Sequence, residues 1–181
     1  MARILLIAGH NGAGTGAHGI IDEGAETIVL RDLVELSLIN LDVEVITDKE
    51  RDSLSAVIAD MKAKARPDDI LVDIHFNAAN KKASGTETYH ARKATDYEKR
   101  LAAELNKTVC ACLGTRSRGI KAESSSQHSS LGILHCGCPS VLLEVCFCDN
   151  ADDVRRYRER RNILGRNIAN FLAEFCKTPM V

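Results

Sequence analysis

The apolar positions along the chain predict strands and helices in alternation. Short, nearly continuous apolar runs are typical of buried strands, as at 4–8 and 141–147, and we interpret 43–47, 70–77 and 86–90 as further strands. Between these runs the apolar residues recur at helical spacing, and the helices that we expect cover 25–36, 54–65, 97–112 and 154–175. Such alternation favours one α/β domain over residues 1–181, a twisted, mostly parallel sheet with helices on both faces.

The segment 114–139 lacks this periodicity. Gly114 is placed to end the third helix, because glycine readily adopts the left-handed conformation of a helix C-cap. Much of 122–130 is rich in serine. We therefore expect a flexible loop near the functional site.

Composition places the chain among ordinary globular proteins. Its 181 residues suit one domain, and a net charge of −1 gives no overall attraction to nucleic acid or to an anionic membrane. No apolar run approaches the roughly 20 residues of a membrane span, and 4–8 is too short for a signal-peptide core. We expect synthesis in a cytoplasm and no partner among nucleic acids or membranes. Seven cysteines, an odd number, argue against a disulfide scaffold.

Four ionisable residues lie at expected strand ends or helix starts: His10, Glu23, His75 and Glu144. Two histidines and one glutamate form a common catalytic zinc set that leaves a fourth position open for water. Glu144 interrupts the apolar run 141–147, where an unpaired carboxylate is costly to bury. A glutamate that does not bind the metal can accept a proton from that water. These residue types indicate a hydrolase.

Five short segments resemble those of a known family. In chain order they are AGH (8–10) with GIIDE (19–23), DIHFNA (73–78), GTETY (85–89), SRGIK (117–121) and PSVLLEVCF (139–147). In type and order they resemble the zinc-dependent N-acetylmuramoyl-L-alanine amidases of the amidase-3 family, especially the catalytic domains of bacteriophage endolysins. The resemblance extends from residue 8 to about residue 155. It implies a single Zn²⁺ ion bound by His10, Glu23 and His75, with Glu144 as the catalytic carboxylate. The implied substrate is peptidoglycan, cut between N-acetylmuramic acid and L-alanine.

Three further residues are candidates for contacts with substrate: Asn77, Lys121 and His128. Asn77 is expected on the same side of its strand as His75, because side chains alternate with period two. Lys121 and the nearby Arg118 could contact carboxylates of the stem peptide. The simpler interpretation of these two residues is that they are ordinary surface charges. His128, or else His135, could stabilise a developing oxyanion.

The chain departs from the family pattern after its first histidine. Many members carry an Asp-Pro-Gly-Ala stretch there, whereas this sequence has 11–16 instead. The second ligand is therefore open, since Glu26 and His18 lie close to Glu23. We favour Glu23, because 19–22 resembles the lead-in to the family's ligand glutamate. We expect a single catalytic domain over 1–181 without a cell-wall-binding module.

Other interpretations compete with the amidase. Two C-x-C pairs could bind a metal or act in redox chemistry: Cys136, Cys138, Cys146 and Cys148. The arginines of 155–161 could contact nucleic acid, but interleaved acidic residues favour a solvated helix face. A zinc exopeptidase would use similar ligands and further aspartates. The sequence does not decide between a phage endolysin released through a pore and an exported bacterial enzyme without its signal. It does not give the oligomeric state either.

Overall fold

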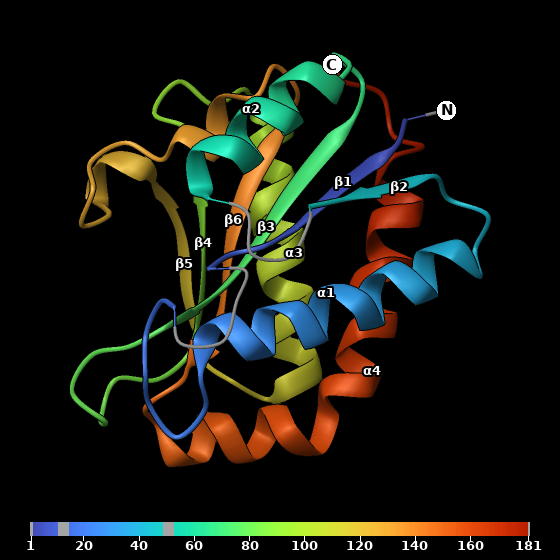
Figure 1. The fold of residues 1–181 in the computed structure, drawn as a ribbon. Coiled ribbons are helices and arrows are strands. Elements are labelled where there is room, and N and C mark those ends of the chain that lie inside the picture. The colour runs from blue at the N-terminus through green and yellow to red at the C-terminus, as the bar shows by residue number, and fades with distance from the viewer. Residues whose placement is uncertain (1, 11–14, 49–52, 181) are drawn as a thin grey trace.

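The computed structural model describes residues 2–10, 15–48 and 53–180 and has alternating strands and helices (Figure 1). The strands are β1 (Ile4–Ala8), β2 (Val45–Thr47), β3 (Ile70–Asn77), β4 (Thr86–His90), β5 (Ser117–Ala122) and β6 (Ser140–Phe147). The helices are α1 (Glu23–Ile39), α2 (Leu54–Lys64), α3 (Asp96–Leu113) and α4 (Ala151–Phe175). Every predicted strand and helix is present, although β2 is shorter than expected.

The six strands form one sheet in the order β2-β1-β3-β6-β4-β5. Strands β2, β1, β3 and β6 run parallel to one another, β4 is antiparallel to β6, and β5 is parallel to β4. The prediction of a single-domain, mostly parallel α/β fold is confirmed. Since parallel strands end at the same edge, the carboxyl ends of β1, β3 and β6 meet there.

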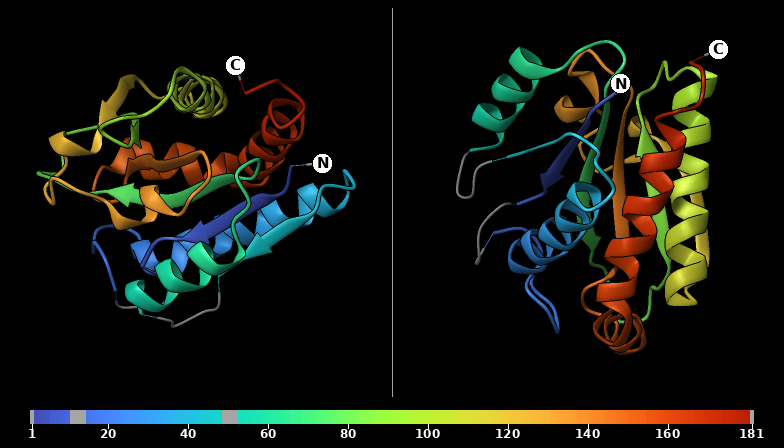
Figure 2. Two further views of the ribbon diagram at one scale, coloured as in Figure 1. Left: turned by 90° about the horizontal axis from the view of Figure 1, so that it is seen from above. Right: turned by 90° about the vertical axis from the view of Figure 1, so that its right-hand side faces the viewer.

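The two faces of the sheet have separate apolar cores. Helices α1, α3 and α4 pack on one face, and α2 packs on the other together with the segment 131–138 (Figure 2). Along β3, Ile74 and Phe76 point into the first core and Leu71 into the second. Strand alternation therefore directs Asp73, His75 and Asn77 to the α2 face, which α2 covers only in part.

Local signals fix the helix ends. Asp22 is the N-cap of α1, and its side chain accepts a hydrogen bond from the amide of Ala25. This cap makes Glu23 the first residue of α1. Gly114 ends α3 in the left-handed conformation, with φ of 69°, as predicted.

The prediction of an irregular loop over 114–139 was wrong in part. The segment contains β5 and two short 3-10 helices, Glu123–Ser125 and Gly132–His135. Strand β5 lies at the edge of the sheet, pairs only with β4 among the described strands, and is half-buried or exposed. An edge strand of this kind needs no continuous apolar run, so hydrophobic patterning does not reveal it.

Two sequence expectations concern other parts of the chain. The departure from the family pattern at 11–16 falls largely on residues 11–14, which lie outside the described residues. Across the described part of the chain, no helix has the length and apolar character needed to cross a membrane.

Candidate metal centre and active site

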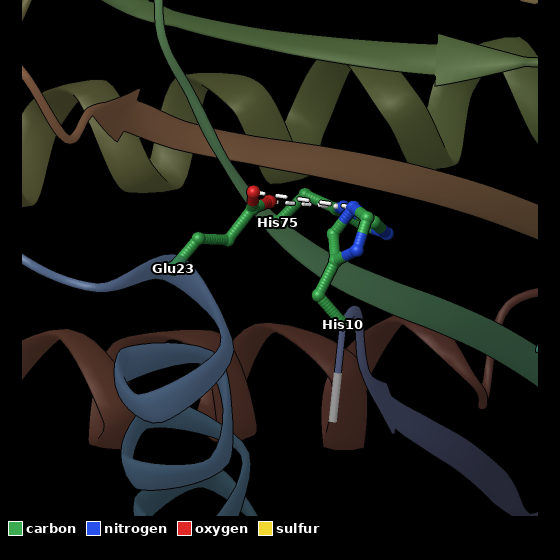
Figure 3. Close-up of side chains that lie close together, drawn as sticks. All are labelled: His10, Glu23 and His75. Atoms are coloured by element: carbon green, nitrogen blue, oxygen red, sulfur yellow. Dashed lines mark hydrogen bonds and ion pairs between the residues drawn. The ribbon is translucent and has the colours of Figure 1, made fainter. Parts of the chain in front are cut away.

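His10, Glu23 and His75 converge from three different elements (Figure 3). His10 follows β1 with φ of 53°, Glu23 opens α1, and His75 lies on β3. One ligand atom from each side chain lies within 4.8 Å of the others. Ligand atoms around a tetrahedral zinc ion lie about 3.4 Å apart, given metal–ligand distances of roughly 2.1 Å. The donor set therefore fits a metal ion after small side-chain adjustments.

Glu23 is held in place by main-chain donors. Its Oε1 accepts a hydrogen bond from the amide of Phe76 at 3.0 Å and lies 3.1 Å from His75 Nδ1. Its Oε2 accepts from the amide of Ala17 at 2.7 Å and lies 4.0 Å from His10 Nε2. Burial by itself raises the pKa of Glu23, but the hydrogen bonds from His75 and the backbone outweigh it and lower the pKa. Glu23 is thus an ionised, preoriented donor.

The two histidines differ in their surroundings. Burial lowers the pKa of His10, and the neighbouring His75 adds to this effect. Burial also acts to lower the pKa of His75, but Asp73 and Glu23 outweigh it and raise the pKa well above its ordinary value. Asp73 and Glu23 thus favour the protonated form of the His75 ring, and a metal ion would compete with that proton.

The alternative ligands lie in other contacts. Glu26 Oε2 lies 3.1 Å from the hydroxyl of Tyr157 and 3.3 Å from Arg161. His18 pairs with Asp22 at 3.0 Å. Among the described residues, the group of potential metal donors contains Glu23 and neither of these two.

Glu144 lies beside this cluster on β6, in register with His75 on β3. Its Oε2 is buried and has no hydrogen-bond partner within the described ranges. Burial is the largest cause that raises the pKa of Glu144 to about 7, and the carboxylates of Glu23 and Glu87 add to it against the attraction of His75. A carboxylate with such a pKa can accept and return a proton near neutral pH.

Glu87 forms a second charged cluster on the adjoining strand β4. Its carboxylate accepts hydrogen bonds from Lys121 Nζ and Arg118 Nε, both at 2.6 Å. Asn77 Nδ2 and the Tyr89 hydroxyl donate to its other oxygen at 2.9 and 3.1 Å. Burial acts to raise the pKa of Glu87, but Lys121 and Arg118 reverse the effect and lower it. Asn77, Lys121 and Arg118 therefore share one buried anion.

Comparison with known sequences decides the family. The sequence model of the N-acetylmuramoyl-L-alanine amidase family, Amidase_3, matches residues 4–174. The chain belongs to this family. The amidase resemblance read from the five segments is thereby confirmed.

Individual relatives agree with this assignment. The uncharacterized protein CPE1502 of Clostridium perfringens is 32% identical over 182 aligned positions, which cover 95% of this chain and 52% of that protein. The N-acetylmuramoyl-L-alanine amidase LytC of Bacillus subtilis is 34% identical over 103 positions, 54% of this chain and 19% of LytC. This amidase-family chain thus spans about half the length, or less, of these two curated relatives.

Solved structures show the same fold. The catalytic domain of the CD27L endolysin, which targets Clostridia difficile, superposes with a TM-score of 0.75 at 22% identity. The match covers 96% of this chain and 98% of that domain. The fold is that of an amidase catalytic domain.

A cavity of about 450 Å³ adjoins the candidate metal centre of this amidase-family fold. His10, His75 and His128 line it together with aliphatic side chains from β1, α2, β6 and the segment 131–133: Ile7, Leu54, Val57, Leu131, Ile133 and Leu142. His128 therefore lies at the candidate site. His135 does not, since its Nε2 lies 3.0 Å from Glu123 Oε2, away from this cavity.

The cysteines do not form one site in the amidase fold. Cys146 and Cys148 belong to the core beneath α1, α3 and α4, whereas Cys136 and Cys138 belong to the core beneath α2. Burial raises the pKa of all four thiols. The C-x-C pairs thus behave as small buried hydrophobes.

The arginines of α4 have structural partners. Arg156 and Arg160 donate to the carbonyls of Gly114 and Cys112 at the C-terminal end of α3, where cations are favourable. Arg161 reaches Glu26 on α1. These contacts join α4 to α3 and α1, and they account for part of the basic run without a nucleic acid.

Two residues of the candidate site were missed by sequence reasoning. Asp73 Oδ2 lies 3.0 Å from His75 Nε2, and Glu87 organises the cations around it. Asp73 could have been found, because it is a carboxylate inside an apolar strand and lies two positions before His75. Glu87 lies within the segment 85–89, and its neighbours in the sequence do not reveal the cations that it meets in the fold.

Proposed function

We propose that this chain is an N-acetylmuramoyl-L-alanine amidase that cleaves peptidoglycan with one zinc ion held by His10, Glu23 and His75. Family membership supports the reaction, and the donor set supports the metal. The observation that carries the proposal is the buried, unpartnered oxygen of Glu144 beside this donor set. When bound there, zinc would polarise the amide carbonyl and acidify a water molecule.

The chain's own residues would handle the proton. Glu144 accepts it from the attacking water at Oε2 and returns it to the departing nitrogen of L-alanine. Its raised pKa matches this task, because the same group must take up and release a proton. Among the described residues, no second metal-donor group accompanies the first, which favours the amidase over a dinuclear exopeptidase.

Substrate contacts would come from two sides of the centre. Lys121 and Arg118 share a single carboxylate, so together they retain positive charge that can meet carboxylates of the stem peptide. Asn77 orients Glu87 between them. His128, on the wall of the 450 Å³ cavity, can donate to the developing oxyanion. Release from a phage-infected cell stays a prediction of the sequence resemblance.

Digestion of purified peptidoglycan tests the reaction. We expect new α-amino groups of L-alanine and no new reducing sugars, with muramic acid free of peptide in the mass spectrum. A chelator should abolish the digestion, and added zinc should restore it. New reducing ends, cleavage of free peptides, or indifference to the chelator would each contradict the proposal.

The Glu144→Gln variant tests the catalytic carboxylate. It should bind one zinc ion as the unaltered protein does and lose at least about 100-fold in turnover. The matched Glu26→Gln variant removes a carboxylate that faces Tyr157 and should keep its activity. A fully active Glu144→Gln enzyme would remove Glu144 from the mechanism.

A further inference from the structure

We infer that Asp73 is a positioning residue that fixes the orientation of His75 as a metal ligand. The inference rests on the metal site proposed above. Asp73 and His75 lie on the same face of β3, two positions apart. Asp73 Oδ2 is 3.0 Å from His75 Nε2, while Glu23 Oε1 is 3.1 Å from His75 Nδ1. Each ring nitrogen therefore faces a different carboxylate.

The two ring nitrogens then have separate tasks. Nδ1 faces the shared donor group that includes Glu23, so Nδ1 is the atom available to a metal (Figure 3). Nε2 then carries the hydrogen and donates it to Asp73. A carboxylate in this position fixes the tautomer and the ring plane of a ligand histidine, and it strengthens the ligand as a donor.

Asp73 lines the cavity beside His75 and is otherwise set among apolar strand residues. It is 3% exposed, and its partners in the register are Ile7 on β1 and Leu142 on β6. Its second oxygen, Oδ1, has no hydrogen-bond partner in the described part of the chain. The single ion pair that the described residues give it is with His75. Burying a carboxylate among apolar side chains is costly, so a neutral residue here would favour folding.

Gly9 completes the setting for the His75 ring. A Cβ added at Gly9 would lie 2.2 Å from His75 Nε2, so the ring packs directly on the bare backbone. The Gly9 backbone is itself held, because its amide donates to Ile74 and its carbonyl accepts from Thr27. The ring is thus confined between Gly9 and two carboxylates, and Asp73 sets its rotation.

Zinc affinity of Asp73 variants tests this inference without any activity assay. We expect Asp73→Ala to weaken zinc binding by about 10–100-fold in competition with a chromophoric chelator. Asp73→Asn keeps an acceptor oxygen and should lie between Asp73→Ala and the unaltered protein. The control is Asp60→Ala, which removes an exposed carboxylate that pairs with Lys64 on α2 and should leave the affinity unchanged.

A spectroscopic readout covers the case in which Asp73→Ala fails to fold. In the zinc-loaded protein, ¹⁵N chemical shifts should show the His75 proton on Nε2, and Asp73→Asn should move that proton signal upfield. A metal-bound Nε2, or an unmoved proton signal, overturns the inference, and so does an unchanged zinc affinity in a folded Asp73→Ala protein. If the unaltered protein binds no zinc at all, the proposed function fails first.

Discussion

Glu87 and Glu144 face each other across the antiparallel strands β4 and β6, yet their environments are opposite. Glu87 accepts hydrogen bonds from two cations, and its pKa is lowered. Glu144 has a buried oxygen without a partner among the described residues, and its pKa is raised to about 7. Two neighbouring carboxylates whose pKa values are moved apart can divide structural and proton-transfer tasks between them.

The raised pKa of Glu144 predicts how the stability of the metal-free protein depends on pH. A carboxyl group whose pKa is higher in the folded state makes its full contribution to folding stability below its unfolded pKa of 4.5. This contribution is lost as pH rises toward the folded pKa of about 7, because the buried group must then ionise. Glu144→Gln removes this cost. Chelator-treated Glu144→Gln should therefore be more stable than the unaltered protein at pH 8, by up to about 3 kcal/mol. Urea unfolding should show the difference vanish below pH 4.5, and a constant difference would contradict the assigned pKa.

Glu87→Gln should have the opposite pH dependence. Because the pKa of Glu87 is lowered in the folded protein, its charge stabilises the fold at pH values above the ordinary glutamate pKa of 4.5. This stabilisation is lost as pH falls from 4.5 through the lowered pKa. The variant leaves Arg118 and Lys121 without their anion, and both are partly exposed. We expect a loss of roughly 1–3 kcal/mol at pH 7 and an increase in KM for peptidoglycan fragments. If the Glu87→Gln variant and the unaltered protein were equally stable at pH 7, the cluster of Glu87, Arg118 and Lys121 would not stabilise the fold.

Glu23 and Glu26 form a matched pair for the second ligand. Glu23→Gln should weaken zinc binding by at least about 100-fold, because it removes the anionic donor of the set. Glu26→Gln should keep zinc affinity within about threefold and lose only about 1 kcal/mol of stability, from its contacts with Tyr157 and Arg161. Isothermal titration of both variants separates the two assignments. The reverse pattern would make Glu26 the ligand.

Gly9→Ala should damage the metal site more than the fold. The new methyl group would meet the His75 ring at 2.2 Å from Nε2, so the ring would have to leave its position between Asp73 and Glu23. We expect zinc affinity to fall by at least about 10-fold. The control is Gly165→Ala, whose methyl group would meet Leu33 at 2.8 Å between α1 and α4. It should change the melting temperature and leave zinc affinity intact, and an equal loss in both variants would refute a local effect.

The fold and the main site residues could be predicted because both depend on local patterns. The alternation of strand-like segments with helically spaced apolar residues located the four helices and every strand except β5. Residue type and position at strand ends and helix starts made His10, Glu23 and His75 candidates, the family resemblance then implied them as the ligand set, and the structure brings their side chains together. Glu144 could be named because a carboxylate is costly inside an apolar run.

The rest depended on pairings that no local pattern contains. Glu87 meets Lys121, 34 positions away, only because the edge strand β5 pairs with β4. The direction of β4 relative to β6 places Glu87 opposite Glu144, and a single strand's sequence does not specify its direction. The different positions of His128 and His135 depend on the short 3-10 helix Gly132–His135, which has no apolar period and carries His135 at its end.

A crystal structure of the zinc-loaded protein, with anomalous data collected at the zinc edge, tests the account most directly. We predict a single anomalous peak within about 2.1 Å of one atom each from His10, Glu23 and His75, with a Glu144 oxygen close to the open coordination position. A peak on the cysteines or on Glu26, or ligand atoms too far apart to share one ion, would contradict it.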